Sequence, residues 1–393
     1  MKQSERFTDR FDWGLLFILM GFCLISLIGI WSAQSMEQYG NTNFVLRQAI
    51  WYGVGFVVIL GASQIEPDVY KKTAPYFYAV GILLLIGIAL APESIAPYRN
   101  GAKRWFDLPL IGTVQPSELM KTFYILMLAY IVSRHQEKFI IKNLKHDTWL
   151  LGKILLAAFV PVSLIMNQPD LGTSLVFIAI SAGVIIVSGI SWKLLAPVFG
   201  LAAGGGITIL GLVVYKPEWL EQTLGLQQYQ FGRVYSWLDP HSYQTSEGYN
   251  LLQAMSAIGS GEMFGRGYQS GQVYIPEQHT DFIFSIFGEE FGFIGSSILV
   301  AWFMFLIYHI INVATMTKSP FSTYLCVGIV GMLTFQVFQN IGMTIQLLPI
   351  TGLTLPFVSY GGSSLLITMF SIGLIFSVRY HHRDYMFEGD STL

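Results

Sequence analysis

Long apolar segments alternate with short polar connections along almost the whole chain. A helix needs about 20 apolar residues to cross a hydrocarbon core of about 30 Å, and ten segments reach that length. The pattern therefore predicts an all-α polytopic membrane protein with ten transmembrane helices that form a single domain over residues 1–393. The predicted spans are residues 14–33, 48–65, 75–92, 115–133, 150–167, 171–189, 193–215, 282–312, 321–348 and 355–378.

One connection is far longer than the others and separates the seventh and eighth predicted helices. It covers about residues 216–281, and loops of this length are usually functional or separately folded. Within it, residues 249–258 place apolar side chains from Leu251 to Ile258 on one helical face. This spacing predicts a short helix that lies against the membrane surface.

Composition supports the membrane class. Of the 393 residues, 53% are hydrophobic and 12% are charged, and the net charge is -2 at pH 7. These values exclude soluble enzymes, disordered chains and nucleic-acid-binding proteins. The two cysteines lie in apolar segments, so neither a disulfide framework nor a CxxC metal site is expected. Most Lys and Arg residues fall on the cytoplasmic side if both termini lie there, which predicts an N-in, C-in topology with the long loop outside.

Carboxylates near the predicted spans are candidate site residues, because a charge within the bilayer is costly. In VQPSELMK, Glu118 and Lys121 are one helical turn apart. They fit either a structural ion pair or a pair that orients a substrate-contacting loop. In NQPDLGTS, Asp170 opens the sixth helix and fits either an N-cap or a carboxylate that binds a substrate hydroxyl or a cation.

The segment at residues 274–295, where the long loop returns to the membrane, carries the most information. Small and polar residues from Asp281 to Gly295 follow the spacing of one helical face, which either packs tightly or lines a cavity. Asp281, two residues after His279, fits a general base whose pKa burial would raise. The alternative is that Asp281 only caps the eighth helix.

Three outer features leave further alternatives open. The loop at residues 259–267 (GSGEMFGRG) lacks the GK[ST] of phosphate-binding loops and is expected to be flexible. Residues 339–364 are interrupted by Pro and Gly, which fits a re-entrant turn or a segment lining a cavity. Arg99, Lys103 and Arg104 are either tolerated loop charges or an anion contact.

Six motifs in register resemble one family. GAKRWF, VQPSELMK, QPDLGTS, the GSG…GRG loop, PEQHTDFIFSIFGEEFGFIG and LPITGLTLPFVSYGGSS occur in the order found in the shape, elongation, division and sporulation (SEDS) proteins, the RodA/FtsW/SpoVE family. The resemblance covers nearly the whole chain, and QYGNTNF after the first predicted helix is more similar to the RodA branch.

This resemblance implies both a fold and an activity. The family has ten helices with a large extracellular loop between the seventh and the eighth. It polymerises lipid II into peptidoglycan strands at the outer face of the bacterial cytoplasmic membrane, for cell-wall elongation and rod shape. The GlcNAc 4-hydroxyl attacks the anomeric carbon of MurNAc with inversion and expels undecaprenyl pyrophosphate. The implied partners are lipid II and a class B penicillin-binding protein transpeptidase, with no nucleic acid.

The resemblance also assigns roles to single residues. Asp281 matches the family's essential loop aspartate and is the expected general base, while Asp170 and Glu118 match two further acidic positions. A divalent cation, Mg²⁺ or Mn²⁺, between Asp281 and the pyrophosphate is an additional hypothesis. The expected substrate-binding residues are Lys103, Arg104, Trp105, Lys121, Arg233, Arg266, His279 and Thr280, whose basic members would contact the pyrophosphate.

Two rival functions fit a polytopic bundle with broken helices. One is a flippase for lipid-linked precursors, since transporters share these features, although no clear pair of inverted repeats is present. The other is a non-catalytic scaffold that positions the transpeptidase.

Overall fold

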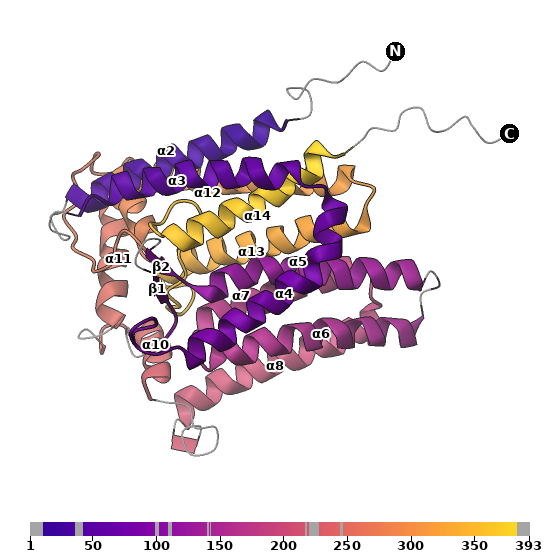
Figure 1. Cartoon of the computed structure of the whole chain (residues 1–393). Helices are drawn as coiled ribbons and strands as arrows, with labels where there is room; N and C mark the ends of the chain where they lie inside the picture. Colours follow the sequence, from indigo (N-terminus) through magenta and orange to yellow (C-terminus); the bar gives the residue numbers. More distant parts are fainter. Residues whose placement is uncertain are drawn as a thin grey trace, which may run out of the picture.

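The computed structural model describes residues 11–35, 42–98, 102–108, 112–139, 141, 143–216, 218–219, 228–243 and 247–382. Its long helices form a bundle, and the two described chain ends lie at the same end of that bundle (Figure 1). Six basic residues that enter the topology prediction, and part of QYGNTNF, lie outside the described residues. These basic residues are Lys2, Arg6, Arg10, Arg99, Lys142 and Arg383.

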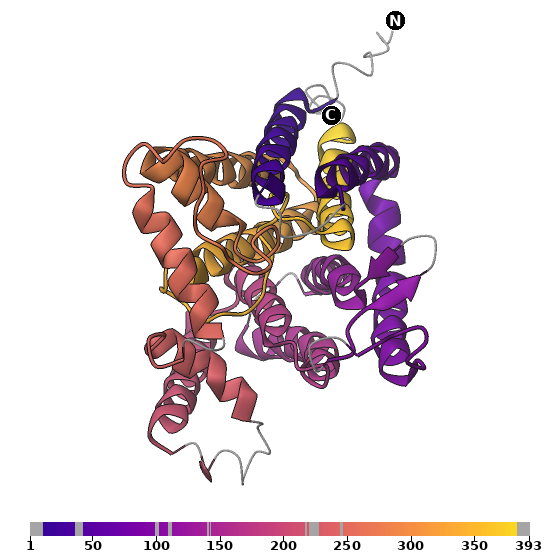
Figure 2. The ribbon, with the colours of Figure 1, turned by 90° about the vertical axis from the view of Figure 1, so that its left-hand side faces the viewer.

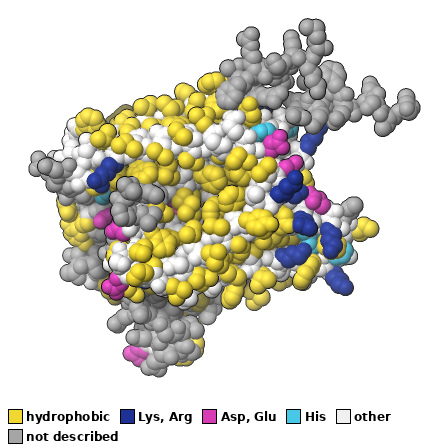
Figure 3. Space-filling model, viewed as in Figure 1, with side chains coloured by type: hydrophobic (Ala, Val, Ile, Leu, Met, Phe, Trp, Pro, Cys, Tyr) yellow, Lys and Arg dark blue, Asp and Glu magenta, His cyan; other side chains and the backbone are white. Residues whose placement is uncertain are grey.

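Each predicted span overlaps one long helix. These helices are α2 (Trp13–Ser35), α3 (Phe44–Gln64), α4 (Pro67–Leu90), α5 (Pro116–Lys138), α6 (Leu144–Met166), α7 (Leu171–Val187), α8 (Trp192–Tyr215), α12 (Ile283–Met316), α13 (Pro320–Thr344) and α14 (Gly362–Tyr380). Among the described residues, eight helices are long and apolar enough to cross a membrane, all of these except α5 and α7. The coarser prediction, a helical multi-pass membrane protein, is therefore confirmed. Apolar side chains cover the middle of the face seen in Figure 3, while Lys and Arg gather toward the end that holds the chain termini.

Helix α5 lies inside the bundle, which explains why its composition is not that of a lipid-facing helix. It contacts α4, α6, α7, α13 and α14, and most of its side chains are buried. Because protein rather than lipid surrounds α5, polar side chains such as Glu118 and Lys121 can be accommodated there. The shorter α7 has 17 residues and packs against α13.

The last helix starts later than predicted. Residues 345–361 are not helical, and α14 begins at Gly362. Pro349 and Pro356 lack a backbone N–H, so this stretch cannot continue α13 as a regular helix. The segment instead returns into the protein, where Thr351, Leu353, Phe357 and Val358 contribute buried side chains.

A break at Gly292 interrupts the eighth predicted span. Gly292 has φ 65° and ψ -159°, so α12 consists of two helices joined at this residue. The break leaves backbone groups without helical partners, and the loop at residues 261–267 supplies them. The Glu289 carbonyl accepts from the Arg266 amide at 2.9 Å, and the Glu290 carbonyl accepts from the Gly267 amide at 3.1 Å. The Phe293 amide donates to the Glu262 carbonyl at 2.9 Å. The loop that was expected to be flexible is therefore hydrogen-bonded into the broken helix.

The predicted short helix in the long loop exists, and it packs on the bundle. It is α11 (Glu247–Ser260), preceded by α10 (Gln228–Leu238). Leu251, Ala254 and Ala257 are buried in a cluster with Phe282 and Met343, so α11 covers α12 and α13 rather than resting on the membrane surface alone. Small residues make this contact close, since a Cβ on Gly288 would lie 2.6 Å from a side-chain carbon of Ile258.

Candidate active site

A cavity of about 920 Å³ opens at the end of the bundle away from the chain termini. A hairpin of β1 (Phe106–Leu108) and β2 (Gly112–Val114) lies to one side of this end and α11 to the other (Figure 2). Segments far apart in the sequence supply charged side chains to the cavity wall. They are Arg47, Arg104, Asp107, Glu118, Asp170, Arg233, Glu277 and Asp281.

Asp281 lies in the turn just before α12 and faces the cavity. Gly352 approaches it from the opposite wall, where a Cβ would be 3.4 Å from Oδ2 of Asp281. Burial, followed by repulsion from Glu277 and Asp170, raises the pKa of Asp281 to about 7, and the attraction of Arg233 opposes this rise. A carboxyl group with such a pKa can exchange a proton at neutral pH.

His279 and Thr280 line the same wall. The His279 ring packs in a three-ring cluster with Phe44 and Tyr360, with centroid separations of 4.6 and 5.5 Å. Burial lowers the pKa of His279 to about 4, so the imidazole is neutral at pH 7. The Thr280 hydroxyl donates to the Glu277 carbonyl at 2.8 Å, which tightens the turn before Asp281.

Asp170 caps α7 and also faces the cavity. Its Oδ1 accepts from the Thr173 amide at 3.1 Å, and its Oδ2 accepts from Nε2 of Gln115 at 3.2 Å. The capping interpretation is thus confirmed, and because Asp170 is also part of the cavity wall, capping does not exclude contact with a ligand.

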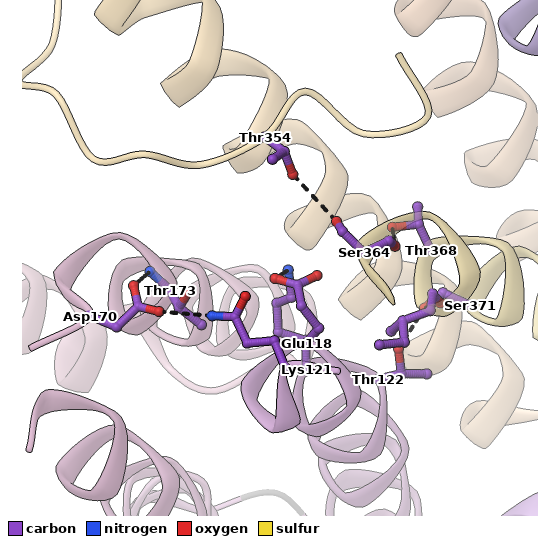
Figure 4. A network of polar contacts seen from close by, with 11 residues as sticks. Glu118, Lys121, Thr122, Asp170, Thr173, Thr354, Ser364, Thr368 and Ser371 are labelled. Carbon is purple, nitrogen blue, oxygen red and sulfur yellow. Dashed lines mark hydrogen bonds and ion pairs between the residues drawn. The ribbon is translucent and has the colours of Figure 1, made fainter. Parts of the chain in front are cut away.

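Glu118 and Lys121 form a buried ion pair at 2.8 Å. Figure 4 shows them between Asp170 on one side and hydroxyl groups of α14 on the other. Glu118 lines the cavity, whereas Lys121 is 1% exposed and does not. Lys121 therefore lies behind Glu118 as its counter-ion, and not at the surface where the sequence analysis expected it to bind substrate.

Arg104 and Trp105 line the cavity just before β1. Nε of Arg104 donates to the Gln168 carbonyl at 2.8 Å, and its Nη2 donates to the Pro169 carbonyl. These bonds connect Arg104 to the turn that carries Asp170. Lys103 differs from the expectation, because its ammonium group donates to the Ala91 carbonyl and does not line the cavity.

Arg233 and Arg266, which both lie between α8 and α12, differ in their relation to the cavity. Arg233, on α10, lines the cavity and interacts electrostatically with Asp281. Arg266 lies outside the cavity, where its side chain donates to Gln272 (2.8 Å) and to the Ser260 carbonyl (3.3 Å). Arg266 is therefore not part of the cavity wall, and its substrate contact stays a prediction.

Two cavity residues, Arg47 and Trp51 in the first turns of α3, were not predicted from the sequence. Tyr360 to Ser364 also line the cavity, and they belong to the segment at residues 339–364 that was predicted either to form a re-entrant turn or to line a cavity. Nothing in the local sequence marks the α3 residues, since Arg47 follows an N-cap at Asn43 and looks like an ordinary interfacial charge.

The described residues offer no group of three His, Cys, Asp or Glu side chains that could hold a metal ion. The donor set around Asp281 therefore does not fit a resident divalent cation on its own.

The bundle and the acidic and basic groups in its cavity define a multi-pass membrane protein with a site suited to acid–base chemistry on a charged substrate. A model of the FtsW/RodA/SpoVE cell cycle proteins matches residues 12–384. The chain belongs to this family of cytoplasmic-membrane proteins.

Relatives and solved structures agree with this assignment. Peptidoglycan glycosyltransferase MrdB of Escherichia coli is 34% identical over 97% of both chains. The probable peptidoglycan glycosyltransferase FtsW of Geobacter metallireducens is 31% identical over 96% of both. A chain from a peptidoglycan synthase complex, described as coordinating polymerization and crosslinking, superposes with a TM-score of 0.75 at 28% identity over 94% of this chain and 97% of that one. The rod shape determining protein RodA of Thermus thermophilus gives 0.66 at 26% identity over 94% and 96%.

Proposed function

We propose that this protein is a peptidoglycan glycosyltransferase that polymerises lipid II at the outer face of the cytoplasmic membrane, with Asp281 as the general base. The observation that carries the proposal is a single cavity, at one end of a membrane bundle, in which Asp281 and the arginines Arg104 and Arg233 meet. The names of the relatives support the reaction class.

In the proposed reaction, the GlcNAc 4-hydroxyl of one chain attacks the anomeric carbon of a MurNAc. Asp281 accepts the hydroxyl proton as the new C–O bond forms. The bond to the pyrophosphate breaks, and its electron pair leaves with the undecaprenyl pyrophosphate. A pKa near the working pH suits Asp281 to this transfer.

Cationic side chains would stabilise the departing pyrophosphate. Arg104 retains donors beyond the two bonded to carbonyl groups, and Arg233 and Arg47 face the same space. Guanidinium groups bind phosphate oxygens in a fork, which favours them over lysine here. Lipid II and the growing strand are the substrates of this site.

The proposal includes a topology. All ten long helices cross the membrane, both termini are cytoplasmic, and the segment between α8 and α12 lies outside. The positive-inside distribution supports this orientation, and so does the common end of the two described chain ends. It puts the cavity beside the outer leaflet, where the lipid-linked sugar is found.

A class B penicillin-binding protein is the proposed partner. The support is the structural similarity to a chain from a peptidoglycan synthase complex. Such a partner would crosslink the strands that this chain makes.

The test is polymerisation of lipid II by the purified protein with its cognate transpeptidase, read as glycan strands on a gel. Asp281→Asn should lower the rate by about 10²-fold or more, since a general base contributes at least that much. Asp239→Asn, at an exposed turn of the same loop, is the matched control and should retain activity. Full activity of a folded Asp281→Asn protein would reject Asp281 as the base.

The same preparation separates the rival functions. Translocation of lipid II across proteoliposomes without polymer would support the flippase, and stimulation of the transpeptidase alone would support the scaffold. Loss of polymer on chelation, restored by Mg²⁺ or Mn²⁺, is the result that a cation at Asp281 requires.

A further inference from the structure

The turn that carries Asp281 is fastened to the C-terminal part of the chain through three consecutive carbonyl groups. The His279 carbonyl accepts from the Tyr360 amide at 2.9 Å, and the Thr280 carbonyl accepts from Oγ of Ser359 at 2.6 Å. The Asp281 carbonyl accepts from Nδ2 of Asn340, on α13, at 2.7 Å. Residues 279–281 thus have their carbonyl groups fixed by donors at least 59 positions away in the chain.

Asn340 also fixes the wall opposite Asp281. Its Nδ2 makes a second bond, to the Leu353 carbonyl, at 2.7 Å. Leu353 follows Gly352, the residue that faces Oδ2 of Asp281. Asn340 is completely buried, and because its amide nitrogen carries two N–H donors it can donate to both carbonyl groups at once.

The segment around the donor Ser359 is itself held by α2 and α3. In the segment that contains Ser359, three carbonyl groups accept bonds from buried side chains of α2 and α3. They are Phe357 from Tyr52 (2.6 Å), Val358 from Ser26 (2.8 Å) and Ser359 from Gln48 (3.2 Å). The hydroxyl of Ser359 also accepts from the Leu355 amide at 2.8 Å.

The side chain of Asp281 has no comparable support. Within the described residues, its carboxylate accepts no hydrogen bond, and the turn before it is neither helix nor strand. The backbone contacts are therefore what sets the position of the carboxylate.

We infer that Asn340 is a positioning residue for the glycosyl transfer, which holds the Asp281 carboxylate at a fixed distance from the wall at residues 351–354. This inference rests on the proposed role of Asp281 as the base. Neither Asn340 nor Ser359 lines the cavity, so both act through the turn and not on the substrate.

Loss of this anchor should be visible in the titration of Asp281 as well as in the rate. The groups that act on this carboxylate are Glu277 on its own turn, Asp170 before α7 and Arg233 on α10, with neutral His279 beside it. A turn released from Asn340 would let the carboxylate move toward solvent and Arg233, and its pKa would then fall toward the ordinary value.

The experiment compares Asn340→Ala with Gln339→Leu in the lipid II polymerisation assay. Gln339 is the neighbouring buried amide on α13 and donates to the Pro349 carbonyl at 2.9 Å, outside the Asp281 turn. Each variant therefore loses a buried amide contact, but only Asn340→Ala releases Asp281. We expect Asn340→Ala to lower kcat about 10- to 100-fold with KM nearly unchanged, as small misplacements of catalytic groups do.

The pH profile provides the second readout. In a plot of kcat against pH, the acid limb is the range in which kcat rises as Asp281 loses its proton. This limb should move to lower pH by about half a unit or more in Asn340→Ala and remain in place in Gln339→Leu. Ser359→Ala should change kcat and the profile in the same direction, and it is the working variant if Asn340→Ala does not fold. The thermal unfolding temperature of each variant measures separately how much stability the substitution removes.

An equal loss of kcat in Asn340→Ala and Gln339→Leu, or an acid limb that does not move, would overturn the inference. Asp281→Asn is assayed alongside to separate the two claims. If Asp281→Asn is active, the proposed base is wrong. If it is inactive while the folded Asn340→Ala and Ser359→Ala proteins keep the parent kcat and profile, only the positioning role is wrong.

Discussion

At the residue scale, the environment of Asp281 predicts how the reaction depends on pH. The carboxylate must be deprotonated to accept a proton, and its pKa is raised from 3.8 to about 7 by burial and by Glu277 and Asp170. The rate should therefore rise as the pH increases through about 7, and not near 4. Measuring kcat for lipid II polymerisation against pH provides the test.

Glu277→Gln tests the cause of this dependence. Removing the negative charge lowers the pKa of Asp281, so the acid limb should shift to lower pH by about half a unit. The Asp239→Asn control should keep the parent profile. A profile with no limb between pH 5 and 9, or one that Glu277→Gln leaves in place, would contradict the assignment.

Single residues were predictable where a motif carried them. Asp281, Asp170, Glu118 and Arg104 lie together in one cavity, as their motifs suggested. Arg47 could not be found in this way, because its place in the cavity wall depends on how α3 packs against α14. Side-chain direction was equally inaccessible from the sequence, and Lys103 and Arg266, which were expected to bind substrate, do not line the cavity.

At the element scale, the break in α12 explains why residue 292 is a glycine. The sequence pattern had indicated only that this helical face carries small residues. A Cβ on Gly292 would lie 2.3 Å from the Gly265 amide nitrogen, and φ 65° is strained for any other residue. We therefore expect Gly292→Ala to lower the thermal unfolding temperature of the detergent-solubilised protein by several degrees.

Gly204→Ala is the matched control for this substitution. Gly204 lies within α8 and has no atom within 4 Å of the position of an added Cβ. Alanine is the better helix former, so this variant should be as stable as the parent or slightly more stable. Equal unfolding temperatures of Gly292→Ala and Gly204→Ala would show that the contact between the loop and the broken helix contributes nothing to thermal stability.

Element boundaries were predictable to within a few residues at α5 and α7, but α4 begins at Pro67, eight residues before the predicted position 75. Asn43 and Asp170 accept from the first-turn amides of their helices, and Pro116 stands at the start of α5. The break in α12 was not predictable, since hydropathy is continuous across Gly292 and the backbone partners come from a loop 23 to 31 positions earlier.

At the scale of the whole molecule, the proposed topology makes a direct prediction. Asp239 lies in the segment between α8 and α12, and Lys318 lies between α12 and α13 at the other end of the bundle. The probes are the single substitutions Asp239→Cys and Lys318→Cys. In a background without Cys23 and Cys326, a membrane-impermeant maleimide should label Asp239→Cys in cells whose cytoplasmic membrane is intact. Lys318→Cys should react only after that membrane is opened, and the reverse pattern would invert the topology.

The overall architecture was the most predictable level, because the bilayer imposes one length and one polarity on every lipid-facing helix. That constraint does not apply to α5, which other helices cover, although the apolar pattern had predicted its span as well. How the helices pack, and so where the cavity lies, depends on contacts between segments far apart in the chain.

The position of the cavity also has a pharmacological consequence. In the proposed orientation, a compound that occupies the space between Asp281 and the arginines reaches it without entering the cytoplasm. Such an inhibitor needs no passage across the inner membrane and escapes pumps that export drugs from the cytoplasm. Its design is therefore free to carry the fixed charges that recognition of Arg104 and Arg233 requires.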